Sequence, residues 1–231
     1  MKIQLFNFEN DICEMDKYIN VLEIEDQKLF VRIVQSFNDI ANGVEPEETI
    51  HFYINDEHVE LYNKIDCIID IFNKDIVTKK INNSLYSKIE KQINENIDIL
   101  IKCDNHIKEI NNILIPFFNE FDFNLKFDNN FKIDDFLKYI KLNIDYEEIN
   151  ILDRILLIID LESLFHLNEI IVFIDLKKYF TKEDIIEIYK YSKYKNVYIF
   201  LIESISSGIT NEYERKIIID NNYDEFLLEN Q

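Results

Sequence analysis

The stretch NEIIVFIDLKKYFTKEDIIEIYKYSKYKNVYIFLIES, residues 168–204, decides the predicted fold. Two apolar runs, at residues 170–174 and 197–202, flank an amphipathic segment that begins at Thr181 and ends at Asn196. Continuous runs rich in Ile, Val and Phe are typical of strands buried on both faces, and the length of the connection suits a right-handed parallel crossover. The stretch therefore predicts a strand, a helix and a second, parallel strand.

The helix inside this stretch carries its own start signal. Thr181 can accept a hydrogen bond from the first helical turn, and Asp184 stands three residues later, where it can complete a capping box. The residues expected to pack on the sheet recur at intervals of three and four: Ile185, Ile188, Tyr189 and Ser192. We therefore expect an α/β core.

The N-terminal part extends this core. Residues 20–26 predict a strand, and Asp26 is the expected N-cap of a following helix. The apolar stripe of that helix consists of Leu29, Phe30, Ile33, Val34, Phe37 and Ile40, and Gly43 stands where a left-handed residue ends a helix. Residues 49–54 and 59–62 alternate in polarity and predict a β-hairpin at the edge of the sheet.

Strands are also expected at both ends of the chain. Residues 2–8 predict an edge strand near the N-terminus. Residues 216–220 form a third apolar run, and residues 223–228 add a last turn or an edge strand.

In the middle of the chain the apolar residues no longer form continuous runs but recur at helical intervals. Ile65, Ile68, Ile69 and Phe72 indicate a helix, and an apolar stripe then runs through one long helix at Leu85, Ile89, Ile93, Ile97, Leu100 and Ile107. A stripe this narrow is typical of a coiled-coil-like hairpin, which Pro116 ends or kinks. A polar loop at 122–130 and a shorter helix at 134–140 follow. A further helix, starting at Asp145 or Asn150, leads back to the central strand.

The expected organisation is therefore a discontinuous α/β head, residues 1–64 and 150–231, with a helical domain, residues 65–149, inserted in it.

Composition restricts the function. The formal net charge is −20, from 45 acidic and 25 basic residues, which counts against nucleic-acid binding through overall charge. At physiological salt, screening limits the range over which exposed charges interact to about 8 Å. A local basic patch on an otherwise acidic protein could therefore still bind DNA. The longest apolar runs are about six residues, whereas a membrane span needs roughly 20. No signal peptide precedes the first strand, so we expect a cytoplasmic protein with no membrane contact.

The usual catalytic motifs are missing. Cys13, Cys67 and Cys103 are widely separated, which predicts reduced thiols and neither a disulfide nor a zinc site. The two glycines, Gly43 and Gly208, are isolated and form no phosphate loop. The four histidines, His51, His58, His106 and His166, form no ligand or base motif, so each is expected to be an ordinary surface or core-edge residue.

One segment is denser in Asp and Asn side chains than the rest of this acidic chain. It comprises Asp122, Asn124, Asp128, Asn129, Asn130, Asp134 and Asp135. Oxygen ligands in a loop are what Ca²⁺ takes, although the spacing is not that of an EF-hand.

Four segments together resemble a known family. They are residues 21–35, 171–184, 199–204 and 213–220, with the sequences VLEIEDQKLFVRIVQ, IVFIDLKKYFTKED, IFLIES and YERKIIID. In this order and spacing they resemble the short-form DNA-end-binding ring proteins of type II-A CRISPR adaptation modules.

The resemblance implies a degenerate RecA-like, P-loop-like α/β head without a functional Walker motif, carrying an inserted α-helical leg. It implies a homotetrameric ring that binds double-stranded DNA ends without sequence preference and without catalysis. The ring would act with the CRISPR integrase proteins and the effector nuclease, and calcium would hold its shape. The implied calcium ligands are Asp122, Asp128 and Asp135, and the implied DNA contacts are Lys132, Lys138, Lys141, Lys177 and Lys178.

The sequence is also compatible with two alternatives. The chain could be a protein scaffold of the adaptation complex with little DNA binding. It could also be a cryptic metal-dependent nuclease or NTPase that uses Asp175, Glu203 or the pair Asp134 and Asp135.

Overall fold

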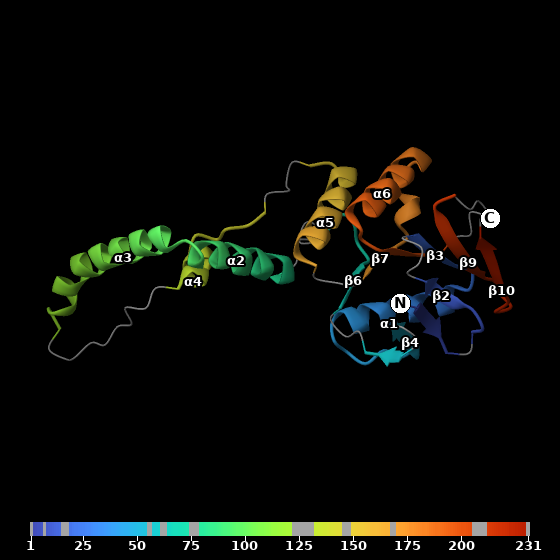
Figure 1. Cartoon of the computed structure of the whole chain (residues 1–231). Coiled ribbons are helices and arrows are strands. Elements are labelled where there is room, and N and C mark those ends of the chain that lie inside the picture. The colour runs from blue at the N-terminus through green and yellow to red at the C-terminus, as the bar shows by residue number, and fades with distance from the viewer. Residues whose placement is uncertain are drawn as a thin grey trace. The chain divides into compact units, whose positions relative to one another are not determined.

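The computed structural model describes residues 2–6, 8–14, 19–54, 57–60, 64–73, 79–121, 132–144, 149–166, 170–204 and 212–229. The chain forms two compact units. We call the first, Met1–Ile76 with Tyr146–Gln231, the α/β unit, and the second, Val77–Asp145, the helical unit (Figure 1).

A six-stranded sheet forms the centre of the α/β unit. Its strands are β3 (Ile19–Ile24), β6 (Ile65–Ile68), β7 (Ile170–Ile174), β8 (Ile199–Glu203), β9 (Glu214–Ile219) and β10 (Glu225–Glu229). They lie in the order β10-β9-β3-β8-β7-β6, and all neighbours are parallel except β10, which runs antiparallel to β9 at one edge. The predicted α/β class is confirmed.

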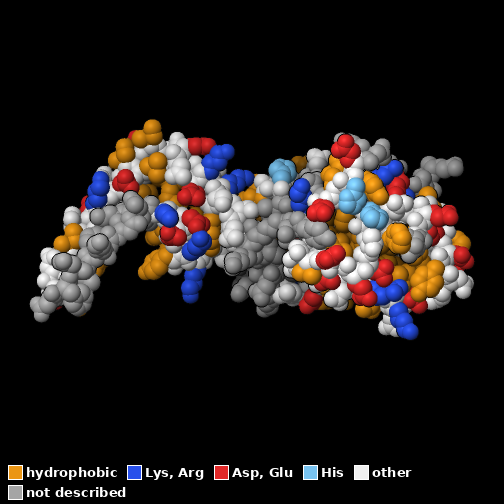
Figure 2. Space-filling view, turned by 90° about the horizontal axis from the view of Figure 1, so that it is seen from below, with side chains coloured by type: hydrophobic (Ala, Val, Ile, Leu, Met, Phe, Trp, Pro, Cys, Tyr) orange, Lys and Arg blue, Asp and Glu red, His pale blue; other side chains and the backbone are white. Residues whose placement is uncertain are grey.

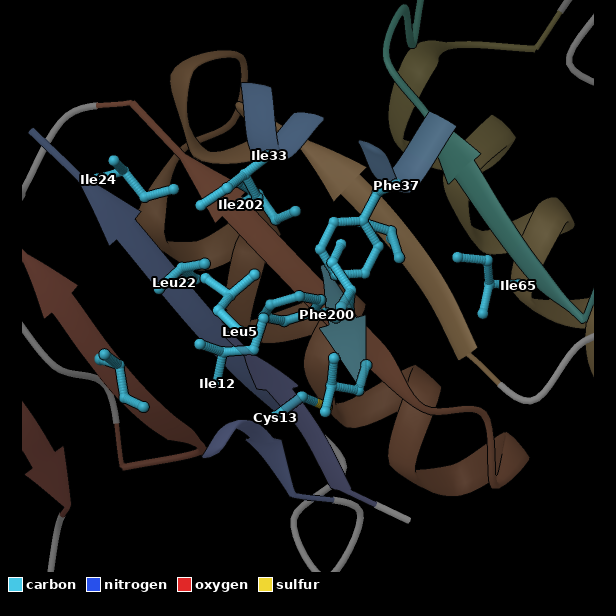
Figure 3. Packing of buried hydrophobic residues seen from close by; sticks show 14 of the residues in the cluster. Leu5, Ile12, Cys13, Leu22, Ile24, Ile33, Phe37, Ile65, Phe200 and Ile202 are labelled. Carbon is cyan, nitrogen blue, oxygen red and sulfur yellow. The ribbon is translucent and has the colours of Figure 1, made fainter. Parts of the chain in front are cut away.

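Helices cover both faces of this sheet. On one face, α1 (Gln27–Ala41) packs Ile33 and Phe37 against Phe200 and Ile202 of β8, and the rings of Phe37 and Phe200 meet edge to face at 5.5 Å (Figure 3). On the other face lie α5 (Ile151–Phe165) and α6 (Lys182–Lys195). Successive strand residues therefore enter different cores, which is why the strands are continuously apolar.

The predicted crossover is correct in detail. Thr181 caps α6, its side chain accepts a hydrogen bond from the amide of Asp184, and the Asp184 carboxylate accepts one from the amide of Thr181. The stripe of Ile185, Ile188, Tyr189 and Ser192 is buried, and Asn196 ends the helix in the left-handed conformation.

The N-terminal strands form a second sheet, which the sequence analysis did not foresee. It contains β1 (Lys2–Leu5), β2 (Asp11–Glu14), β4 (Ile50–Ile54) and β5 (Glu57–Val59), all antiparallel, in the order β2-β1-β4-β5. The expected hairpin is present, but it belongs to this sheet. β1 lies between two strands and is not an edge strand.

Residues 65–68 are a second correction. They form β6, paired in parallel with β7, and not the start of a helix. This strand belongs to the α/β unit, because the boundary between the units falls after Ile76.

The helical unit consists of α2 (Lys79–Asn94), α3 (Ile97–Phe118) and α4 (Ile133–Tyr139). The predicted single long helix is broken before α3, where the Asn96 side chain accepts a hydrogen bond from the amide of Ile99. Pro116 lies inside the last turn of α3. Tyr86 of α2 packs with Ile133 and Leu137 of α4, so these two helices share a small core.

The cysteines are free thiols: Cys13 is buried, and Cys67 and Cys103 are half-buried.

Candidate DNA and calcium sites

Three of the predicted DNA contacts lie on or beside α4. Lys132 precedes the helix, Lys138 lies in its last turn, and Lys141 follows it with a positive φ of 53°. All three are exposed, but Lys138 forms an ion pair with Asp134. The hydrogen bond from Lys138 to Asp134 raises the pKa of the ammonium. Lys132 and Lys141 have no carboxylate partner within the described residues.

Of the three predicted calcium ligands, the structure describes one. Asp122 and Asp128 fall outside the described residues, whereas Asp135 is exposed in the first turn of α4. Among the residues that the structure describes, no group of three or more His, Cys, Asp or Glu side chains could hold a metal ion. The donor chemistry of the acidic segment, carboxylate and carboxamide oxygens, is of the kind that fits Ca²⁺.

The other two predicted DNA contacts lie in the short 3₁₀ helix Leu176–Lys178 after β7. The Lys177 ammonium is 2.9 Å from Oε1 of Glu214, and its side chain is only 18% exposed. Lys178 donates to the Asp175 carboxylate at 2.7 Å and to the Ser204 hydroxyl at 2.6 Å. Phosphate binding by either lysine would require its ammonium to exchange a carboxylate for a phosphate.

A buried charged cluster surrounds the partner of Lys177. Glu214 accepts a hydrogen bond from the Tyr189 hydroxyl at 2.9 Å, and it lies 3.9 Å from the ammonium of Lys216. Lys216 in turn donates to Glu23 at 2.6 Å, and both of these side chains are fully buried. The sequence did not predict this cluster. Its only signal was a charged residue inside two of the predicted strands, Glu23 in residues 20–26 and Lys216 in residues 216–220.

Glu203 ends β8 beside this cluster. It is 3% exposed and accepts a hydrogen bond from the amide of Lys177 at 3.1 Å. Burial raises the pKa of its carboxyl from 4.5 to about 7, and the hydrogen bond and charge of Lys177 only partly oppose this.

A doubly wound sheet binds a nucleotide beyond the carboxyl ends of its central strands, which here are β3 and β8. In this chain β3 passes directly into α1, with Asp26 as the N-cap. Carboxylates stand at that edge, Glu23, Glu203 and Asp175, and the described residues there include no glycine loop whose amides could bind a phosphate. The Asp175 carboxylate is engaged by Lys178 and by the amide of Ser204.

Comparison with known proteins decides the family. The profile of the CRISPR-associated protein (Cas_Csn2) family matches residues 45–223. The chain belongs to the Cas_Csn2 family. The family to which the sequence resemblance pointed is thereby confirmed, and a CRISPR-associated role with it.

A solved structure has a similar fold. The chain is similar to the crystal structure of Stu0660 of Streptococcus thermophilus, with a TM-score of 0.66 and 14% sequence identity, over 99% of this chain and 77% of that one. No curated protein matches the sequence. Within the described residues, no helix is long and apolar enough to span a membrane.

Proposed function

We propose that this Cas_Csn2 chain binds the ends of double-stranded DNA, without sequence preference and without catalysis, as a homotetrameric ring during CRISPR spacer acquisition. The observation that carries the proposal is the family match, which extends over the whole helical unit and most of the α/β unit. The integrase proteins and the effector nuclease of the same system are the proposed partners, and the cytoplasm is the proposed location.

The proposed role of the α/β unit is that of a degenerate RecA-like head. A parallel sheet with helices on both faces supports this role. The direct passage from β3 to α1 supports the lack of NTP hydrolysis, because it leaves no room between them for a loop whose backbone amides would bind phosphate. The head would thus serve assembly and not chemistry.

The proposed DNA contacts begin at α4. Lys132 and Lys141 are exposed and would neutralise phosphates directly. Lys138, Lys177 and Lys178 would contribute after release from Asp134, Glu214 and Asp175. Phosphate contacts of this kind carry no sequence information, which fits a protein that accepts any DNA end.

Calcium is proposed as a structural ion held by Asp122, Asp128 and Asp135. A dication would neutralise part of the negative charge near the lysines of α4. It would supply no reaction, because the proposed function contains no chemical step.

A protein scaffold with little DNA binding is the second candidate. Two observations favour it: the net charge of −20, and the pairing of Lys138, Lys177, Lys178 and Lys195 with carboxylates. A metal-dependent nuclease or NTPase is the third, and it would require Asp175, Glu203, Asp134 or Asp135 to bind a metal in place of its present partner.

The deciding experiment compares a linear duplex with the same DNA as a covalently closed circle, with calcium and then with chelator, while light scattering reports the oligomer mass. Retention of the linear DNA alone by a tetramer supports the ring. Binding of neither DNA at low salt supports the scaffold. Metal-dependent cleavage that disappears on substitution of Asp175 or Glu203 supports the enzyme.

A further inference from the structure

Two histidines face each other on the outer surface of the four-stranded sheet. Strand β4 directs Ile50 and Phe52 into the core, so His51 lies on the opposite face, where β5 brings His58 beside it. Nδ1 of His51 is 3.4 Å from Nε2 of His58. Figure 2 shows histidine side chains gathered on the surface of the α/β unit.

The distance between these two nitrogens is that expected of two ligands on one metal ion. Zinc binds imidazole nitrogen at about 2.0–2.1 Å, so two nitrogens on a tetrahedral zinc lie about 3.3–3.4 Å apart. Imidazole also suits copper and nickel, whereas Ca²⁺ takes oxygen ligands. Without a metal, the same distance fits a long hydrogen bond in which one of the two nitrogens carries a proton and donates it to the other.

The surroundings leave room for the rest of a coordination sphere. A pocket of about 190 Å³ adjoins the pair and is lined by both histidines and by Glu45 and Glu60. No cluster of three metal-binding side chains is present in the described part of the chain, so the two imidazoles would be the fixed ligands. Water, or a carboxylate that moves in, would complete the tetrahedron.

We propose that His51 and His58 form a surface site for a first-row transition-metal dication of the zinc type, separate from any calcium site of the protein. This site departs from the sequence-based expectation for the two residues. They are seven positions apart, and only the pairing of Phe52 with Val59 and of Tyr53 with His58 brings their rings together. The site does not depend on the proposed DNA function.

The test is calorimetric titration of the chelator-treated full chain with Zn²⁺ in excess Ca²⁺. We expect a Zn²⁺ site that Ca²⁺ does not block. His51→Ala and His58→Ala should each lower the Zn²⁺ affinity at least about 10–100-fold. That is the loss typical of a residue that only contacts a metal ligand, and a direct ligand should matter no less. The double variant gives the baseline for adventitious binding to other groups. The matched control is His106→Ala in the helical unit, where the exposed His106 ring lies 3.2 Å from Glu109 and not beside a second histidine.

Two further measurements make the outcome decisive. Circular dichroism, together with a milder His58→Gln variant, excludes unfolding as the cause of any loss. Nitrogen-15 spectra of the histidine rings should show Nδ1 of His51 and Nε2 of His58 shifting together as Zn²⁺ is added. Unchanged ring signals, no Zn²⁺ binding by the wild-type chain, or equal affinity in the double variant would overturn the proposal.

Discussion

The Lys216 ammonium lies 2.6 Å from a carboxylate oxygen of Glu23, and both side chains are fully buried between the sheet and its helices. Loss of one member of such a pair leaves a charge buried without compensation, which costs about 3–5 kcal/mol. We therefore expect Lys216→Met to lower the free energy of unfolding by that amount in chemical denaturation.

The control for this prediction is a pair of the same type at the surface. Arg32 lies 3.1 Å from Glu48, and its side chain is 45% exposed. Arg32→Met should cost no more than about 1 kcal/mol. The double substitution Glu23→Leu with Lys216→Met should recover much of the lost stability, because apolar replacement of both charges removes the desolvation penalty. Equal costs for Lys216→Met and Arg32→Met would contradict the burial of this pair.

Glu203 should make stability depend on pH. Its carboxyl is neutral in both states below about pH 4.5, whereas above about pH 7 folding must bury its charge. The free energy of unfolding should therefore fall as pH rises through this window, by about 3 kcal/mol for a pKa raised from 4.5 to about 7. Glu203→Gln should flatten the profile, and Glu48→Gln at the surface should not. An unchanged profile in Glu203→Gln would exclude Glu203 as its source.

The capping box of α6 gives a local prediction. Thr181→Ala removes the acceptor of the Asp184 amide hydrogen bond and should cost about 1 kcal/mol in thermal or chemical unfolding. Thr181→Ser keeps a hydroxyl and should cost clearly less. Identical stability of the two variants would mean that the box contributes nothing to folding.

This capping box also shows why part of the fold could be predicted. Thr181, Asp184 and Asn196 act within a few residues of each other, so their roles are written locally in the sequence. The buried strands on either side were equally clear, because each is apolar on both faces.

Residues 65–68 show where the same logic fails. Ile65 and Ile68 are three positions apart, which is the spacing of one helix face. In the structure they belong to a strand and enter the two different cores on opposite sides of the sheet. A short strand whose first and last residues are buried on opposite faces can thus show the three-residue spacing of a helix by chance.

The candidate site was harder to predict than the fold, since its contacts join distant parts of the chain. Nothing near Lys177 in the sequence indicates that its ammonium will form an ion pair with Glu214. Lys132 and Lys141, by contrast, are exposed, and their contact with DNA stays a prediction. Asp122 and Asp128 stay a prediction, because they lie outside the described residues.

The difference between these lysines can be measured. Lys132→Gln and Lys141→Gln should each weaken DNA binding uniformly across sequences and lower the slope of log affinity against log salt by about 1 for each contacting subunit. Lys28→Gln on α1 is the control at an exposed position outside the proposed interface. Lys177→Gln should instead lower stability, because it leaves Glu214 without its closest cation. A salt slope that responds to Lys28 as much as to Lys132 would contradict a contact at α4.

The most direct test of the ring asks whether the protein can load onto DNA whose two ends are already blocked. A linear duplex carries biotin at both ends, and streptavidin is added either before or after the protein in the presence of calcium. A ring that threads DNA ends should fail to load when the ends are blocked first. When they are blocked afterwards, it should stay on the DNA through a high-salt wash that releases it from open ends. Equal binding in both orders would contradict threading and would leave lateral binding or the scaffold as the account of this protein.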